Sequence, residues 1–145
     1  MPSPNSLNPS KGRDFQTLAA RVLETELGVR FLIDRAIPIG SPPKLHRFDL
    51  VSDDERFVGE CKNYSWTETG NMPSAKMAFL NEAVLYLSLL PKSTQKFIVM
   101  RLDAHPKRGT LLEYYLRTFR HLLSGVAFYE IDLSTGVARQ HRIDC

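Results

Sequence analysis

The chain has few cysteines and no long hydrophobic run, and both shortages restrict the classes of protein it can belong to. Only two of its 145 residues are cysteines, Cys61 and Cys145. Two cysteines this far apart make neither a disulfide framework nor the clustered spacing of a zinc site, and a reducing cytoplasm is the expected location. The longest apolar run, "AVLYLSLL" at 83–90, is too short to span a membrane. No membrane partner is therefore expected.

The remaining composition is that of an ordinary globular domain. Hydrophobic residues make up 43% of the chain and charged residues 24%, a balance that allows a buried core. The N-terminal "MPSPNSLNPS" lacks the hydrophobic region of a signal peptide. We therefore expect a disordered lead-in over residues 1–11 and a single domain over residues 12–145. The formal net charge of +3 permits nucleic-acid binding without establishing it.

The pattern of apolar residues predicts strands clustered early in the chain and then alternating with helices. Helices are predicted at about 13–27, 75–90 and 110–123, and strands at about 29–39, 45–52, 56–64, 96–102, 126–133 and 137–143. This order predicts an α/β fold with a mixed central sheet flanked by helices. The early strands should form an antiparallel meander, and the strands joined by helices should pair in parallel.

Two of the predicted strands, in "HRFDLVSDDERFVGECKNY" at 46–64, place acidic side chains opposite each other. A hairpin with a two-residue loop at Asp54-Glu55 puts Asp49 opposite Glu60, with Cβ atoms roughly 5 Å apart. Lys62 lies two residues beyond Glu60 and so points to the same face. Asp-Glu is a poor sequence for a tight turn, and a longer loop would shift this register.

Two facing carboxylates repel, so a shared proton, a nearby lysine or a divalent cation must neutralise them. Mg²⁺ favours carboxylate oxygens together with water and phosphate oxygens. Two acids and a lysine on adjacent strands are therefore the groups that metal-assisted phosphodiester hydrolysis requires. The other interpretation is a structural ion pair between Glu60 and Lys62, because E-x-K is a very common pattern. Asp49 and the order of elements favour the catalytic interpretation.

The arrangement of Asp49 on one strand and Glu60-Cys61-Lys62 on the next resembles the motif of the PD-(D/E)XK, or restriction-endonuclease-like, nuclease superfamily. The resemblance covers most of the chain. It implies an αβββαβ core with an active site on its hairpin that depends on Mg²⁺ or Mn²⁺. It also implies catalytic roles for Asp49, Glu60 and Lys62, and metal binding by Asp49, Glu60 and Cys61.

The first predicted helix departs from this pattern at Gln16. The segment "KGRDFQ" at 11–16 resembles the opening of archaeal-type Holliday junction resolvases, where a glutamate stands at the position of Gln16. A glutamine supplies an oxygen atom but no charge. Gln16 is therefore a candidate catalytic residue that puts the metal stoichiometry, or the activity itself, in question. Glu26 is a second candidate on this helix, although its position near the helix end favours an orientation towards water.

Basic residues flank the predicted site. Lys44 and Arg47 precede Asp49, and Lys76 begins the second predicted helix, so these three are candidate phosphate contacts. A solvated lysine at a helix end is the alternative for Lys76. Trp66 could stack on a base, but packing of a loop over the sheet is the interpretation we prefer.

The function expected from the sequence is metal-dependent hydrolysis of phosphodiester bonds, with DNA preferred to RNA as the substrate. No added recognition domain, helix-turn-helix or zinc motif is visible, which indicates an endonuclease of limited sequence specificity. Cleavage of both strands of a duplex would favour a homodimer. Gln16 favours the alternative of a catalytically inactive nuclease-fold module that binds nucleic acid or a protein partner. A structural assembly protein with an ordinary ion pair at 60–62 is a third, weaker interpretation.

Overall fold

The computed structural model describes residues 9–143, so residues 1–8 of the expected lead-in and Cys145 lie outside the described residues. In chain order, the elements are α1 (Pro9–Leu27), β1 (Phe31–Ile39), β2 (Lys44–Ser52), β3 (Phe57–Lys62), α2 (Ser74–Ser88), β4 (Gln95–Arg101), β5 (Ala104–His105), β6 (Gly109–Thr110), α3 (Leu111–Phe119), the 3₁₀ turn η1 (Arg120–Leu122), β7 (Val126–Asp132) and β8 (Val137–His141).

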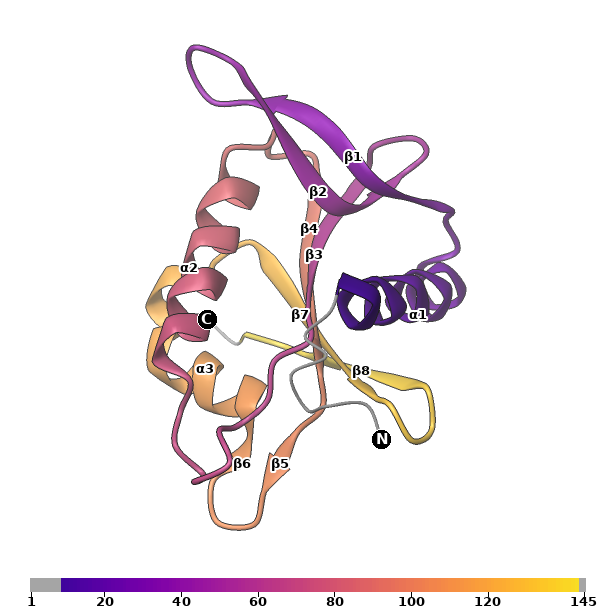
Figure 1. Cartoon of the computed structure of the whole chain (residues 1–145). Coiled ribbons are helices and arrows are strands. Elements are labelled where there is room, and N and C mark those ends of the chain that lie inside the picture. The colour runs from indigo at the N-terminus through magenta and orange to yellow at the C-terminus, as the bar shows by residue number, and fades with distance from the viewer. Residues whose placement is uncertain (1–8, 144–145) are drawn as a thin grey trace.

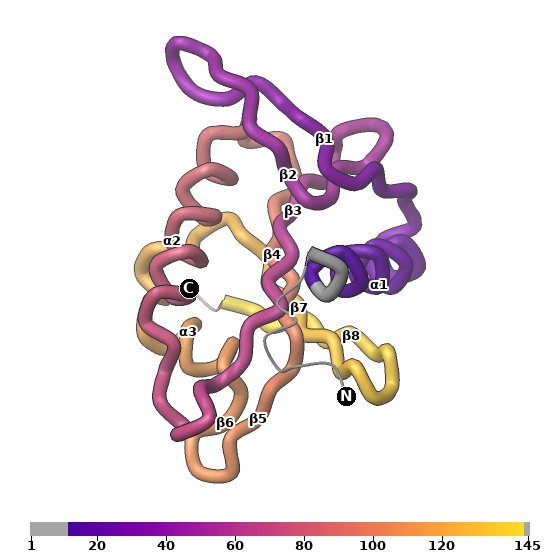
Figure 2. Tube along the Cα trace, in the orientation of Figure 1, coloured from indigo at the N-terminus to yellow at the C-terminus, as the bar shows by residue number. Residues whose placement is uncertain are grey.

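Six of the strands form one mixed sheet in the order β1-β2-β3-β4-β7-β8, and β5 and β6 form a separate short hairpin. Helix α1 covers one face of the sheet, and α2 and α3 cover the other (Figure 1). The Cα trace in Figure 2 shows the β1–β2 hairpin extending beyond the rest of the sheet. Within the described residues, no helix is long and apolar enough to cross a membrane.

The predicted α/β fold with a mixed central sheet flanked by helices is confirmed. Strands β1, β2 and β3 form an antiparallel meander, β4 pairs in parallel with both β3 and β7, and β8 pairs with β7 in the antiparallel direction. The first helix begins at Pro9, four residues earlier than expected, and the third ends at Phe119 before η1. The β5–β6 hairpin was not expected, because each of its strands has only two residues and so shows no apolar alternation.

The sheet separates two apolar clusters. On the α1 side, Phe15, Ala19 and Leu23 pack against Leu50 and Phe97. On the other side a larger cluster joins α2 and α3 to the sheet. Its buried members include Val58, Leu80, Leu87, Ile98, Met100, Leu112, Tyr115 and Phe128. Strand β4 is thus covered on both faces, which explains its unbroken apolar sequence.

The β2–β3 hairpin has the expected register but a different turn. Leu50 pairs with Gly59 and Val51 with Val58, as the predicted register requires. The expected two-residue loop is wrong, because the N–H of Glu55 donates to the carbonyl oxygen of Ser52 at 2.8 Å. Glu55 adopts a left-handed conformation with a φ of 60°. A longer turn avoids the primed conformation that Asp-Glu disfavours, while the ladder keeps its register.

Gly59 is required by the close approach of Phe97, and its replacement tests the packing beneath the hairpin. A Cβ at Gly59 would lie 2.2 Å from Cε2 of the Phe97 ring. Phe97 is buried and has little room to yield. We therefore expect Gly59→Ala to lower the free energy of unfolding by about 1–3 kcal/mol, measured by urea denaturation.

Gly12→Ala is the matched control. A Cβ at Gly12 meets no heavy atom within 4 Å, and alanine favours the helix, so this variant should be more stable by about 0.5–1 kcal/mol. In the Gly59→Ala background, Phe97→Leu should cost less stability than it does alone, because the clash is relieved. A Gly59→Ala protein as stable as the wild type would contradict the packing described here.

Candidate active site

Asp49 and Glu60 lie together where β2 meets β3. The observed pairs, Leu50 with Gly59 and Val51 with Val58, end just before these two residues, and the Asp49 and Glu60 side chains interact beyond the last pair. Glu60 is buried, with 6% of its surface exposed, and Asp49 is half-buried. Burial, followed by hydrogen bonding and charge repulsion from Asp49, raises the pKa of Glu60 to about 9. Glu60 therefore retains a proton at neutral pH unless another positive charge takes its place.

The Asp49 carboxylate is oriented by main-chain and side-chain donors. The N–H of Cys61 donates to Asp49 Oδ2 at 2.8 Å. From α1, Gln16 Nε2 donates to the main-chain oxygen of Asp49 at 3.0 Å and lies 3.4 Å from Asp49 Oδ1. These contacts connect α1, β2 and β3 at one carboxylate.

Gln16 is also buried and presents the nitrogen of its amide, not the oxygen, to the acidic residues. Its Nε2 donates to Asp34 Oδ1 at 3.0 Å as well as to Asp49. All of these partners are acceptors, so the NH₂ group, with its two hydrogens, must face them. In this arrangement Gln16 acts as a hydrogen-bonding tether, and an oxygen ligand at this place would require the amide to turn over.

Asp34 is an acidic residue of the site that the sequence analysis missed. The β1–β2 ladder pairs Ile33 with Leu50 and Arg35 with Phe48, which puts Asp34 opposite Asp49. Its φ of 57° is in the left-handed region, where Asp and Asn are the favoured non-glycine residues. Aligning the predicted strand at 29–39 with the predicted strand at 45–52 would have identified Asp34 as a neighbour of Asp49. Asp34 lines a hollow of about 280 Å³, together with Gly12, Arg13, Gln16, Asp49 and Cys61.

Lys62 lies close to the acidic residues without forming an ion pair. Its charge lowers the pKa of Glu60 against the larger effect of burial, yet no ion pair within 4.0 Å joins Glu60 and Lys62. The interpretation of these residues as a structural ion pair is therefore wrong. Lys62 Nζ lies 5.8 Å from the centre of the Tyr64 ring, and Lys76 Nζ lies 5.1 Å from it. Tyr64 thus brings the two lysines to one place.

His46 is the partner of Glu60. His46 Nε2 lies 3.5 Å from Glu60 Oε1, and its ring stacks on Tyr86 with centroids 3.9 Å apart. Desolvation lowers the pKa of His46, against the opposing charges of Asp49 and Glu82. A raised pKa for Glu60 and a lowered pKa for His46 mean that this pair is held together without ionisation. The hairpin register gives no signal for this contact, because it places Asn63, and not Glu60, opposite His46.

The Cys61 thiol is an unsuitable metal ligand. Burial raises the pKa of this thiol well above its ordinary value, and the charges of Asp49 and Glu60 raise it further. Only the thiolate is a good ligand. A role for Cys61 in metal binding would therefore use its main-chain carbonyl oxygen.

The proposed phosphate contacts differ in their distance from the acids. Arg47 Nη1 donates to the main-chain oxygen of Asp34 at 3.1 Å, which places it at the site. Lys44 begins β2 and is exposed. Five residues of extended strand separate it from Asp49, or roughly 17 Å. The structure therefore brings Arg47 to Asp34 and Lys76 to the Tyr64 ring that Lys62 also approaches, but leaves Lys44 out on the hairpin.

Glu26 and Trp66 lie as the sequence analysis preferred, Glu26 in solvent and Trp66 packed in the protein. Glu26 is exposed, as expected for a residue near the helix end. Trp66 is buried, and its indole Nε1 donates to the main-chain oxygen of Asp103 at 3.1 Å. Neither side chain contributes to the site.

The donor set limits the kind of metal centre that can form. Within residues 9–143, no group of three or more His, Cys, Asp or Glu side chains is arranged to hold a metal ion. Mg²⁺ is commonly held by one or two carboxylates, with water and substrate oxygens as the other ligands. Asp49 and Glu60 supply the two carboxylates that such a site needs. Their repulsion and the burial of Glu60 favour a proton on Glu60, and a cation can take the place of that proton.

The raised pKa of Glu60 predicts a pH-dependent stability for the metal-free protein. The pKa of this group is about 9 when folded and near its ordinary value of 4.5 when unfolded. The folded state therefore holds a proton that the unfolded state releases. The free energy of unfolding should fall as the pH rises from about 5 to about 9. Urea denaturation at a series of pH values measures this slope.

Glu60→Gln should remove this slope, because glutamine does not titrate. Glu26→Gln, which changes an exposed glutamate on α1, should leave the slope unchanged. Wild-type stability that is constant between these pH values, or a slope that persists in Glu60→Gln, would contradict the assignment.

Comparison with known proteins places the chain in no family. No family model matches it, and no curated protein or solved structure matches it either. Its function therefore has to be argued from the geometry of Asp49, Glu60, Lys62 and their neighbours.

Proposed function

We propose that the chain is a metal-dependent nuclease that hydrolyses phosphodiester bonds in DNA. The observation that carries this proposal is the buried Glu60 beside Asp49, with a pKa of about 9. The order α1-β1-β2-β3-α2-β4 supports it, because this is the αβββαβ core that the motif resemblance implies. More specifically, we propose an endonuclease of limited sequence specificity.

Asp49 and Glu60 would hold Mg²⁺ or Mn²⁺, with the Cys61 carbonyl oxygen as a third donor. When bound, such an ion polarises the phosphate and lowers the pKa of its water. Glu60 must lose its proton for this to occur, and the cation supplies the positive charge that favours the ionised carboxylate. Asp49 is already held in position by Cys61 N–H and Gln16.

Lys62 would bind a phosphate oxygen or orient the attacking water. It lies near the acids but has no carboxylate partner within 4.0 Å, so its ammonium group is available. Lys76, which shares the Tyr64 ring, and Arg47 would contact neighbouring phosphates. Double-strand cleavage would require a second active site, and a homodimer is the proposed means of supplying it.

Removal of any one of three side chains should abolish cleavage. We expect Asp49→Asn, Glu60→Gln and Lys62→Ala each to reduce the cleavage rate by about 10²-fold or more, because each removes a charge at the reacting phosphate. The assay is a panel of single-stranded, duplex, branched and RNA substrates with Mg²⁺ or Mn²⁺.

Lys107→Ala is the matched control for Lys62→Ala, because Lys107 is exposed on the β5–β6 turn. It should cleave at the wild-type rate. Full activity in Lys62→Ala, or cleavage that persists in excess chelator, would overturn the proposal.

A second candidate function is a nuclease-fold module without catalytic activity that binds nucleic acid or a protein partner. The observation in its favour is the amide of Gln16, which donates hydrogen bonds where the resemblance implies an acid. In this case Asp49 would be held by Gln16 and Cys61 as a structural group, with no cation.

Manganese binding, followed by calorimetry, separates the two functions. The enzyme should bind Mn²⁺ saturably, and Asp49→Asn should abolish this binding. Gln16→Glu would place a further carboxylate beside Asp34 and Asp49, so it should raise the affinity for Mn²⁺ about tenfold or more. The same repulsion should make Gln16→Glu less stable than the wild type when no metal is present.

The inactive module predicts a different result from the same titrations. The wild type would bind no Mn²⁺ at millimolar concentrations, and only Gln16→Glu, if any variant, would gain a site. That result would favour the binding module over the enzyme.

A further inference from the structure

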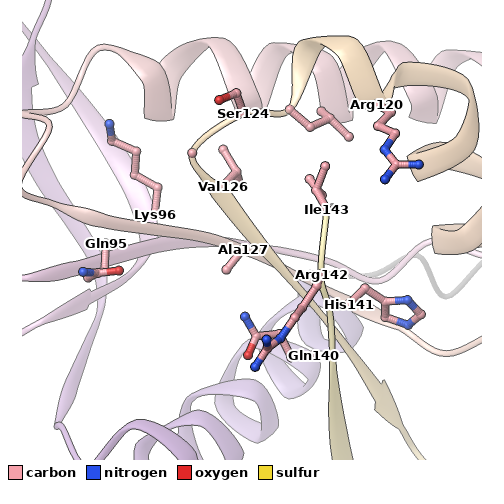
Figure 3. Close-up of a pocket in the computed structure, with 12 residues that line it drawn as sticks. Gln95, Lys96, Arg120, Ser124, Val126, Ala127, Gln140, His141, Arg142 and Ile143 are labelled. Atoms are coloured by element: carbon pink, nitrogen blue, oxygen red, sulfur yellow. The ribbon is translucent and has the colours of Figure 1, made fainter. Parts of the chain in front are cut away.

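A second cavity of the protein lies apart from the acidic site. It has a volume of about 710 Å³. Figure 3 shows Lys96 on one side of it and Arg120 on the other, with Ser124 and Val126 between them. Its lining comes from the start of β4, the end of η1, the start of β7 and the end of β8. The residues are Gln95, Lys96, Arg120, Leu123, Ser124, Gly125, Val126, Ala127, Gln140, His141, Arg142 and Ile143.

The cavity forms where β8 stops pairing with β7, two residues short of the start of β7. The last pair on this ladder joins Phe128 to His141. Beyond it, residues 126–127 and 142–143 have no pairing with each other, and the space between these segments opens. On β4, Lys96 pairs with Val58, whereas Met100 pairs with Lys62. Lys96 thus lies four residues, or roughly 13 Å along the strand, from the level of Lys62.

The wall of this cavity is basic. Lys96, Arg120, His141 and Arg142 line it, and none of the described lining residues is acidic. A smaller cavity of about 190 Å³ shares Arg120 and Arg142 and adds Arg117. Within residues 9–143, neither Lys96 nor Arg142 has an ion-pair partner within 4.0 Å.

Glu130 holds β8 against β7 at one wall of the cavity. It is buried on β7, and its Oε1 accepts hydrogen bonds from Arg139 Nη2 at 3.2 Å and from His141 Nε2. Arg139 and His141 both lie on β8, so the Glu130 side chain binds the end of β8 to β7. Glu130 already binds His141, so Lys96 and Arg142 are the lining cations of this wall without an ion-pair partner among the described residues.

We propose that this cavity binds a phosphate-bearing ligand of nucleotide size. Lys96 and Arg142 supply the cations for phosphate oxygens, and arginine in particular forms strong charge-assisted hydrogen bonds with them. Leu123, Val126 and Ile143 supply an apolar wall for a planar ring, and the two glutamine amides supply donors and acceptors for its edge. The volume falls within the range of small-molecule sites.

The same chemistry is present in a free nucleotide and in the phosphodiester backbone of a nucleic acid. The proposal does not depend on the nuclease proposal, because none of the cavity residues belongs to the Asp49–Glu60 site. A chain without nuclease activity would still bind at this place.

Amide chemical shifts of the full 145-residue chain, recorded by two-dimensional NMR, test the proposal. The probes are inorganic phosphate, AMP and a short thymidine oligonucleotide, the last with the Lys62→Ala chain so that cleavage does not interfere. Saturable shifts should appear at residues 95–96, 124–127 and 140–143. Tighter binding of AMP would identify a free nucleotide as the ligand, and tighter binding of the oligonucleotide would identify a nucleic-acid backbone.

The double variant Lys96→Gln/Arg142→Gln should weaken binding by at least about tenfold for each cation removed. Its charge-matched control, Arg21→Gln/Lys107→Gln, removes two exposed cations outside the cavity and should bind as the wild type does. If the double variant unfolds, Arg142→Gln alone replaces it in the test, because Arg142 is exposed and its substitution should not disturb the fold. No saturable shift at the cavity with any probe, or unchanged affinity in Arg142→Gln, would overturn the proposal.

Discussion

The site depends on one electrostatic constraint, the burial of Glu60 beside Asp49 where β2 meets β3. A carboxylate with 6% of its surface exposed beside another carboxylate cannot ionise freely, and its pKa rises to about 9. The neighbouring arrangement follows from this constraint. His46 approaches Glu60, Lys62 lowers its pKa from a distance, and Asp49 is stabilised by the N–H of Cys61.

Apolar packing away from the acids holds Glu60 and Asp49 in this arrangement. Gly59 lets Phe97 approach β3 closely, and Phe97 belongs to the cluster beneath α1. The same cluster holds α1 in place, and so brings Gln16 to Asp49 and Asp34. The acidic hairpin is therefore supported from the α1 side of the sheet, while α2 covers Glu60 from the other side and contributes Lys76 and Tyr86.

Much of this arrangement was predictable from local sequence. The helices and long strands follow from apolar periodicity, and the hairpin register brings Asp49 and Glu60 to the same part of the sheet. The turn was predicted incorrectly because Ser52 and Glu55 close it through a conformation that propensity alone does not specify. Asp34 was missed because its position depends on the pairing of β1 with β2, which the analysis of single segments does not include.

The sequence by itself determined the order of elements, the mixed sheet and the two acids and lysine on adjacent strands, because these depend on period and spacing. Only the tertiary structure decided what the charges contact. It gave Glu60 a histidine partner instead of Lys62, and it turned the Gln16 amide nitrogen towards Asp34 and Asp49. It also gathered Lys96 and Arg142 around one cavity. These contacts join residues far apart in the chain, and their energies depend on burial, which local sequence does not fix.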